Sequence, residues 1–265
     1  MERGSQNPIS HSSWNDGGSD SIVLIHGAFA AGTWWDLVVP YLPTKYHILT
    51  PDLPGHGQAS EQEFSVPSAV DSVAQLIRDR AIYSHAHVVG HSLGAQVAIQ
   101  LACTHPDIVR SVFISGFGSL PRTLLTPCVP YAVWAMQRVE NLVPRAAVRW
   151  AMDGTDLPRT NTRLNTLALC QQIMAPSDAV PWPSPWPART LIVVAGKGGL
   201  IPSADNTQVA LRLMQTGRER NAATVAYAHP EMRHPWNRQD PRLFADAVIA
   251  WIEEKDLPDG FVKLE

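Results

Sequence analysis

Five residues in the first half of the chain have the types and spacing of a serine nucleophile held at a sharp turn. The sequence G-H-S-L-G at residues 90–94 follows a short apolar run, residues 86–89, and precedes a stretch with helical character. Glycines two residues before and after the serine leave room for a strand to turn at once into a helix, and the strained backbone lifts the hydroxyl above the sheet. The first turn of that helix directs free N–H groups at the same place, where an anion can be held. The pattern predicts a nucleophile elbow with Ser92 as the nucleophile, and a glycine-rich turn without chemistry is the alternative.

A serine hydroxyl needs a base to remove its proton, and chain position selects among the ten histidines. In this order of strands and helices the base lies on the loop between the last strand and the last helix. His229 and His234 both fall there. We favour His234 because it directly precedes the segment that leads into the final helix, and His229 is the reserve.

The oxyanion of a tetrahedral intermediate needs two hydrogen-bond donors. The backbone N–H of Leu93, directly after the serine, is the first expected donor, and the loop after the first strand should supply the second. Ala28 is the candidate on that loop, because small residues at positions 27 and 28 let the backbone come close. Leu93 and Ala28 are therefore the predicted oxyanion hole.

The hydrophobic pattern predicts a sheet that can hold these residues. The expected strands are 21–25, 47–50, 86–89, 109–115, 190–195 and 222–227. The expected helices are 35–42, 66–81, 93–104, 132–142, 145–152, 203–216 and 240–251. Alternation of strand and helix implies an α/β fold, with a mostly parallel sheet covered by helices on both faces.

That alternation stops between residues 117 and 188, which carry helical patterns and many prolines. We interpret this stretch as an inserted helical lid, because it interrupts two core strands and is too short to bury much surface alone. The core then comprises residues 21–116 and 189–265, and residues 1–20 are expected to be a polar N-terminal tail.

Composition excludes several classes of function. A net charge of −3 over 265 residues gives no electrostatic footprint for nucleic acid or an anionic membrane. The apolar runs are too short for a membrane span, and the polar N-terminus lacks the apolar region of a signal peptide. Three scattered cysteines have no metal-type spacing, so a cytoplasmic protein is expected. Without a phosphate loop or nucleotide fingerprint, neither a cofactor nor a metal is predicted, and the oligomeric state stays open.

Four motifs together resemble the α/β-hydrolase superfamily over essentially the whole chain. They are His26-Gly27, residues 52–57 (D-L-P-G-H-G), the elbow at 90–94 and the late His234. The polar N-terminus, in which the leading antiparallel hairpin of many members is missing, and a Trp-Trp pair after His-Gly-Ala resemble the branch of plant-type methylesterases and hydroxynitrile lyases. The resemblance implies the fold and the roles already given to Ser92, His234, Ala28 and Leu93.

One position departs from the family pattern. Members usually place an aspartate three residues beyond the glycine that ends the sixth core strand, and here that slot falls on Gly199. Asp205 is the nearest carboxylate downstream. Three alternatives follow: Asp205 reaches the histidine by an unusual route, the site is a Ser–His dyad, or the serine is no longer a hydrolytic nucleophile.

The chemistry and the aromatic residues together suggest a substrate class. Large apolar side chains occur in the lid and near the expected mouth, which favours a bulky, apolar small molecule: Leu124, Leu125, Tyr131, Trp134, Met136, Trp150 and Met152, with Trp34, Trp35 and Trp236. The leading hypothesis is a serine hydrolase that cleaves an ester, thioester or lactone through a Ser92 acyl-enzyme. A lyase, cyclase or dehydratase of secondary metabolism that uses the same pocket is the alternative, and a ligand-binding module without catalysis is the third.

Overall fold

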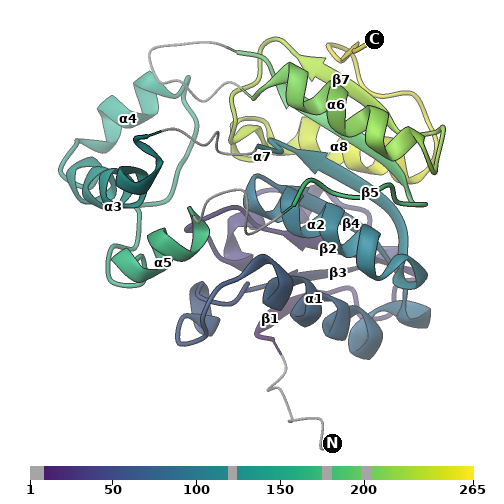
Figure 1. Cartoon of the computed structure of the whole chain (residues 1–265). Helices are drawn as coiled ribbons and strands as arrows, with labels where there is room; N and C mark the ends of the chain where they lie inside the picture. Colours follow the sequence, from purple (N-terminus) through teal and green to yellow (C-terminus); the bar gives the residue numbers. More distant parts are fainter. Residues whose placement is uncertain (1–8, 119–123, 175–180, 198–204) are drawn as a thin grey trace, which may run out of the picture.

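A single mixed sheet organises the computed structural model, which describes residues 9–118, 124–174, 181–197 and 205–265 (Figure 1). Within these residues the strand order is β1-β3-β2-β4-β5-β6-β7-β8. Strands β2 to β7 run parallel, whereas β1 and β8 lie antiparallel at the two edges. The strands are β1 (His11–Trp14), β2 (Asp20–Ile25), β3 (Tyr46–Pro51), β4 (Ala86–His91), β5 (Val109–Ser115), β6 (Arg189–Ala195), β7 (Val225–His229) and β8 (Val262–Lys263). This is the α/β-hydrolase fold that the sequence predicts.

Helices cover both faces of the sheet. One face packs against α1 (Val66–Arg80), α2 (Leu93–Thr104) and α6 (Thr207–Arg218). The other packs against α8 (Pro241–Ile252), which follows the short α7 (Trp236–Gln239). No helix among the described residues is long and apolar enough to cross a membrane.

The central strands are apolar along their whole length because both of their faces are buried. In β2 the side chains of Val23 and Ile25 enter the core on the α1 and α2 face, while Ile22 and Leu24 enter the core on the α8 face. Successive side chains of a strand point to opposite faces, so a continuous apolar run is what a doubly covered parallel sheet requires.

Two of the expected local structures are wrong. Residues 11–14, expected within a polar tail, form β1 and pair with β3 from His11↔Pro51 to Trp14↔Ile48. The composition concealed this strand because β1 is an edge strand with no fully buried residue. An antiparallel strand therefore does precede the parallel core. The helix expected at 35–42 is instead two 3₁₀ turns, η1 (Gly32–Trp35) and η2 (Val39–Tyr41).

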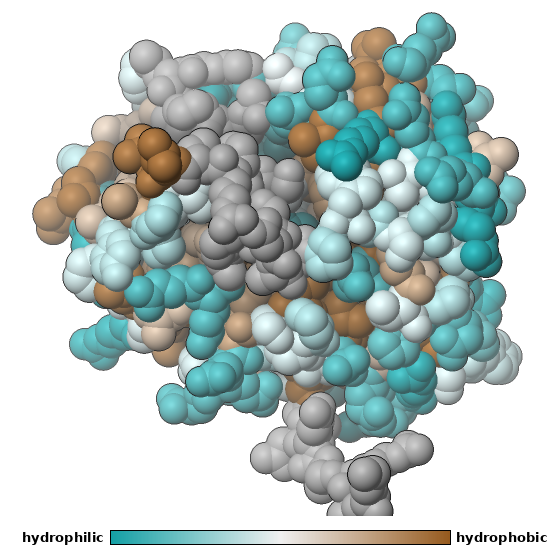
Figure 2. All heavy atoms as spheres, in the orientation of Figure 1, coloured by the Kyte–Doolittle hydropathy of each residue, from teal (hydrophilic) through white to brown (hydrophobic). Residues whose placement is uncertain are grey.

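Residues 117–188 lie between β5 and β6, and we call them the insertion. Its helices are α3 (Val129–Glu140), α4 (Arg145–Ala151) and α5 (Leu167–Ile173). They lie beyond one end of the sheet, on the left of Figure 1, and not on either face. Figure 2 shows apolar surface gathered on this side of the molecule. Most of the exposed large apolar side chains of the described residues belong to the insertion: Leu124, Leu125, Tyr131, Met136, Val139, Leu142, Val143 and Trp150.

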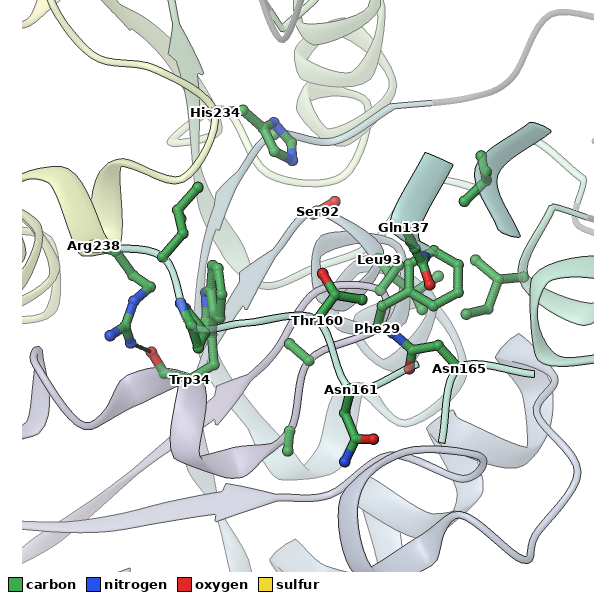
Figure 3. Close-up of a pocket in the computed structure, with 18 of the residues that line it drawn as sticks. Phe29, Trp34, Ser92, Leu93, Gln137, Thr160, Asn161, Asn165, His234 and Arg238 are labelled. Atoms are coloured by element: carbon green, nitrogen blue, oxygen red, sulfur yellow. Dashed lines mark hydrogen bonds between the residues drawn. The ribbon is translucent and has the colours of Figure 1, made fainter. Parts of the chain in front are cut away.

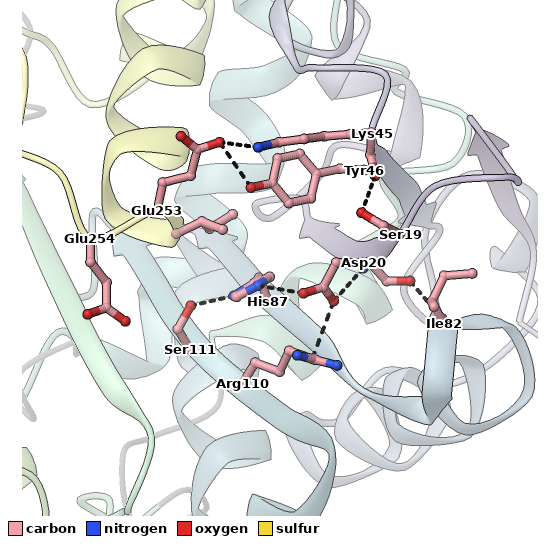
Figure 4. Close-up of polar contacts among 12 residues, drawn as sticks. Ser19, Asp20, Lys45, Tyr46, Ile82, His87, Arg110, Ser111, Glu253 and Glu254 are labelled. Atoms are coloured by element: carbon pink, nitrogen blue, oxygen red, sulfur yellow. Dashed lines mark hydrogen bonds and ion pairs between the residues drawn. The ribbon is translucent and has the colours of Figure 1, made fainter.

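A polar network lies at the end of the sheet that is opposite to the insertion (Figure 4). Nε2 of His87 donates to Asp20 at 3.3 Å, and Nδ1 of His87 accepts from the Ser111 hydroxyl at 2.8 Å. Arg110 makes an ion pair with the same aspartate. Although Ser, His and Asp are the residue types of a hydrolytic site, Ser111 is only 1% exposed. The network therefore joins β2, β4 and β5 and offers no accessible nucleophile.

His26 directly follows β2, the strand that leads to the site, and it is fully buried. The Leu53 N–H donates to its Nε2 at 3.0 Å, so Nδ1 carries the proton and donates to the Gly27 carbonyl at 2.8 Å. Burial, with a smaller contribution from the neighbouring His56, lowers the pKa of His26 to about 3. His26 is therefore a neutral brace between two loops.

The buried, neutral His26 predicts that the free energy of unfolding depends on pH. Because unfolded His26 takes up a proton near pH 6.5 and folded His26 does not, the free energy of unfolding should fall as the pH drops below 6.5. The loss from this residue should be about 1.4 kcal/mol per pH unit until the folded pKa is approached. Urea unfolding of the wild type and His26→Gln between pH 7.5 and 4.5 measures it. The variant should be less stable at pH 7.5 but have a shallower pH slope. Equal slopes would contradict the prediction, since the other buried histidines are common to both proteins.

Candidate active site

Ser92 occupies a strained turn between β4 and α2. Its backbone has φ 56° and ψ −117°, a left-handed conformation that a non-glycine residue rarely adopts. The neighbouring glycines permit the turn, because a Cβ at Gly90 would lie 2.3 Å from the Gly94 carbonyl oxygen and one at Gly94 would lie 2.2 Å from that of Ile25. The predicted elbow geometry is therefore present, with a half-buried Ser92 at its tip.

The two residues predicted to donate to the oxyanion, Leu93 and Ala28, follow Ser92 and Gly27 directly in the chain. Leu93 is the first residue of α2, where helical N–H groups have no intrahelical partner. The loop after β2 approaches from the other side, and a Cβ at Gly27 would lie 3.1 Å from the Cβ of Ser92. Ala28 follows on that loop, and both Ala28 and Leu93 line the same cavity as Ser92. This placement is compatible with the predicted pair of donors.

The loop that carries Ala28 is fixed by Asp52, from the D-L-P-G-H-G motif after β3. One carboxylate oxygen of Asp52 accepts from the Gly32 N–H at 2.6 Å, and the other accepts from the Gln58 N–H at 2.8 Å. Together with His26, Asp52 holds the loops after β2 and β3 against each other at the carboxyl end of the sheet. The motif therefore positions the backbone of the site.

His234 lies on the loop between β7 and α7 and lines the cavity with Ser92. Figure 3 shows its imidazole directed toward the Ser92 hydroxyl. Its Nδ1 donates to Asp205 Oδ1 at 2.6 Å, so Nε2 is the nitrogen left to accept a proton. The side chain of Asp205 is 5% exposed and that of His234 is 29% exposed. Serine, histidine and carboxylate thus gather at the carboxyl end of the parallel strands.

Asp205 resolves the question that the sequence left open. Its Oδ2 accepts from the N–H of Ala195, the last residue of β6, at 2.9 Å, and its own N–H donates to the Ala195 carbonyl at 3.4 Å. These two bonds hold Asp205 at the end of β6. Gly199, the expected slot, lies outside the described residues. The first of the three alternatives, an unusual route from Asp205 to His234, is the arrangement found.

The uncharged ring of His91 packs against the ring of His234. Their ring centroids are 4.8 Å apart, and the indole of Trp34 stacks on His91 with a centroid distance of 6.5 Å. Burial holds the pKa of His91 well below its ordinary value, and the proximity of His234 contributes. A neutral His91 places no like charge against His234 when His234 carries a proton.

The cavity above these groups has a volume of about 1050 Å³. It lies between the core and the insertion, and its apolar lining includes Phe29, Trp34, Phe117 and Met136. Such a volume is at the upper end for small-molecule sites. Among the described residues, no group of three or more His, Cys, Asp or Glu side chains could hold a metal ion.

Several residues singled out from the sequence lie elsewhere. His229, the reserve base, packs its ring against Phe261 at a centroid distance of 5.0 Å and does not line the cavity. Trp35 and Trp236 are fully buried in the core on the α8 face. Leu124, Leu125 and Trp150 are exposed and are not among the residues that line the cavity.

Side-chain contacts hold the insertion against the loop that carries His234, and we call these contacts the clasp. Asp153 Oδ2 accepts from Arg233 Nε at 2.5 Å and pairs with Lys197 Nζ at 3.1 Å, and these cations lower the pKa of Asp153. Arg238 Nε donates to the Asp156 carbonyl at 2.7 Å. Sequence reasoning missed this clasp, because its partners are far apart in the chain.

This fold and site define the α/β-hydrolase class. The model described as "Alpha/beta hydrolase family" matches residues 22–247, so the chain belongs to that family. The resemblance to the plant-type methylesterase branch stays a prediction.

Relatives and solved structures agree with this assignment. An AB hydrolase superfamily protein of Gibberella zeae is 38% identical over 96% of this chain and 86% of its own length. A pimeloyl-[acyl-carrier protein] methyl ester esterase of Neisseria meningitidis is 40% identical, but over only 36% of each chain. A thermophilic esterase from Thermogutta terrifontis has a TM-score of 0.66 at 16% identity, covering 94% of this chain and 96% of its own, which is a likeness of fold alone.

The Asp205–His234 bond predicts the effect of a neutral substitution. In Asp205→Asn an amide N–H facing Nδ1 would favour the tautomer with its proton on Nε2, which could no longer accept one from Ser92. We expect kcat for an aryl ester to fall roughly 10²- to 10⁴-fold, with little change in the fold. Steady-state kinetics measures this, with the exposed Asp246→Asn in α8 as the control. An unchanged kcat would show that the carboxylate is not needed.

Breaking the clasp should reduce activity less than Asp205→Asn does. Asp153→Asn removes the negative partner of Arg233 and Lys197, so the insertion should open more often and kcat/KM should fall by a few-fold. Limited proteolysis should cut the insertion faster. Asp156→Asn is the matched control, because among the described residues its exposed side chain pairs only with Arg145, inside the insertion. Equal cleavage of both variants would count against a clasping role for Asp153.

Proposed function

We propose that this protein is a serine hydrolase that cleaves an ester, thioester or lactone of a bulky small molecule through an acyl-enzyme on Ser92. The observation that carries the proposal is the juxtaposition of Ser92, His234 and Asp205 at one cavity, with the His234–Asp205 bond of 2.6 Å. Membership of the α/β-hydrolase family supports it.

The proposed reaction assigns one task to each group. Ser92 Oγ attacks the carbonyl carbon while His234 Nε2 takes the hydroxyl proton, and Asp205 holds the imidazole in the required tautomer. The N–H groups of Ala28 and Leu93 stabilise the oxyanion, a contribution that is typically about 3 kcal/mol per donor. His234 then gives its proton to the departing alcohol or thiol. Water, activated by the same histidine, releases the acid and regenerates Ser92.

Two features support an ester of a large, mainly apolar molecule. The cavity is roomy and carries aromatic and aliphatic side chains near Ser92. The partial relatives named as methyl ester esterases support ester chemistry but, because they align over about a third of the chain, not a particular substrate.

The non-hydrolytic alternative loses the observation that motivated it. A lyase, cyclase or dehydratase was suggested by the lack of an aspartate at position 199. Since Asp205 bonds to His234, the glycine at position 199 no longer favours a reaction other than hydrolysis.

Covalent labelling tests the proposal directly. A fluorophosphonate probe should label the wild type at Ser92, and 4-nitrophenyl esters should be hydrolysed. Ser92→Ala should lose labelling and at least 10³-fold in kcat, while Ser72→Ala in α1 should retain both. Equal labelling of Ser92→Ala and the wild type would refute the assignment. Wild-type labelling without ester turnover would favour the non-hydrolytic alternative.

A further inference from the structure

The insertion supplies the wall of the cavity that faces away from the core. Val133, Met136, Gln137 and Glu140 of α3 all line it, and their spacing of three, four and seven residues places them on one face of that helix. A second segment lines it at residues 157–161 and 164–165, just before α5. Residues far from the elbow thus shape the part of the cavity that the reacting group does not occupy.

Two amide side chains in this wall are buried without hydrogen bonds. Gln137 is 5% exposed and Asn165 is 3% exposed. Neither the Oε1 atom of Gln137 nor the Nδ2 atom of Asn165 has a hydrogen-bond partner in the described structure. Both residues line the cavity with Ser92, and Figure 3 shows them on the opposite side of Ser92 from Arg238. Buried polar groups are nearly always paired, so these two point to a partner that enters the cavity.

The two segments that carry these amides are fastened to each other. Arg138 Nη2 donates to the Thr162 carbonyl at 3.3 Å, and Asn141 Nδ2 donates to the Thr160 carbonyl at 2.8 Å. Both bonds join α3 to the segment that leads to Asn165. The two segments that carry Gln137 and Asn165 are therefore held in a fixed position relative to each other. A fixed position of the binding groups is a condition for selective recognition.

The chemistry of the free atoms limits what can bind. Gln137 offers an unpaired acceptor and Asn165 an unpaired donor, so the complement is a neutral group with one donor and one acceptor. A carboxamide has both. A carboxylate has only acceptors, which Gln137 Oε1 would repel, and an ammonium has only donors. The charged residues of the same wall, Glu140 and Arg159, have opposite signs and favour neither ion.

We propose that Gln137 and Asn165 form a subsite for a carboxamide, and that the substrate is an ester carrying an uncharged secondary amide away from its scissile bond. This inference rests on the proposed hydrolysis at Ser92. It refines the substrate class: the molecule is apolar beside Ser92 and polar where it meets the insertion.

Matched esters test the subsite. The acyl series starts from 4-nitrophenyl 6-acetamidohexanoate. Its first comparison is 4-nitrophenyl nonanoate, which has the same chain length without the amide. Its second is the 4-nitrophenyl monoester of nonanedioic acid, which ends in a carboxylate. Acetamido esters with chains two carbons shorter and longer vary the reach. A second series places the amide in the alcohol, as 6-acetamidohexyl acetate against nonyl acetate. We expect at least one amide ester to exceed its alkyl counterpart in kcat/KM by about 10-fold or more.

The double variant Gln137→Met, Asn165→Leu keeps side-chain volume and removes both amides. It should lose the preference for amide esters, so that its kcat/KM for the acetamido ester is no higher than that for the nonanoate. Its Tm should stay level or rise, because no hydrogen bond within the protein is lost. Gln172→Met is the contrasting control: Gln172 Oε1 accepts from the Phe64 N–H at 3.0 Å, so this variant should lower Tm and keep the preference.

The outcomes separate the two proposals. Turnover of plain esters without an amide preference in either series would overturn the subsite and leave the hydrolase proposal intact. A preference that survives in the double variant would also overturn it, as would a lower Tm of that variant, which would indicate a structural role. Failure of every ester, together with no probe labelling of Ser92, would instead refute the hydrolase proposal.

Discussion

The close contact of two main-chain segments at the carboxyl end of the sheet controls the geometry of this protein. At Gly94 the first turn of α2 approaches the end of β2 so closely that a Cβ would lie 2.2 Å from the Ile25 carbonyl oxygen. This contact fixes the direction of α2 and forces the left-handed conformation at Ser92. It also brings the loop after β2, with Ala28, to the same point. Such strain persists only where the surroundings over-determine it, and here buried strands on both sides do so.

The sequence predicted the features that depend on local spacing. The glycines of the elbow, the apolar runs of the central strands and the position of His234 all follow from neighbours along the chain. The rest depended on tertiary contacts. β1 is polar because it is an edge strand, and nothing local distinguished it from a tail. The direction of an aromatic ring is set by packing, so Trp35 and Trp236 enter the core while Trp34 faces the cavity. Gln137 and Asn165 carry no sequence signal, since they meet the cavity from separate segments.

The insertion and the core share one set of contacts around His234. Arg233, directly before this histidine, bonds to Asp153 of the insertion. Four residues after it, Arg238 bonds to the Asp156 carbonyl and to Asp36, which follows η1. The loop that holds the imidazole is thus fastened on both sides to the segments that enclose the cavity. Any movement of the insertion would therefore act on the position of His234 as well as on access to Ser92.

The attachment of Asp205 to β6 bears on how the sequences of such sites can diverge while the carboxylate keeps its position. Side chain and main chain of this aspartate both bond to Ala195, so its location in space is set by the end of β6 and not by the number of residues in between. A loop anchored at both ends can lengthen at small entropic cost. Insertions there can accumulate without displacing the carboxylate, and a fixed spacing in a sequence motif will overlook proteins in which they have done so.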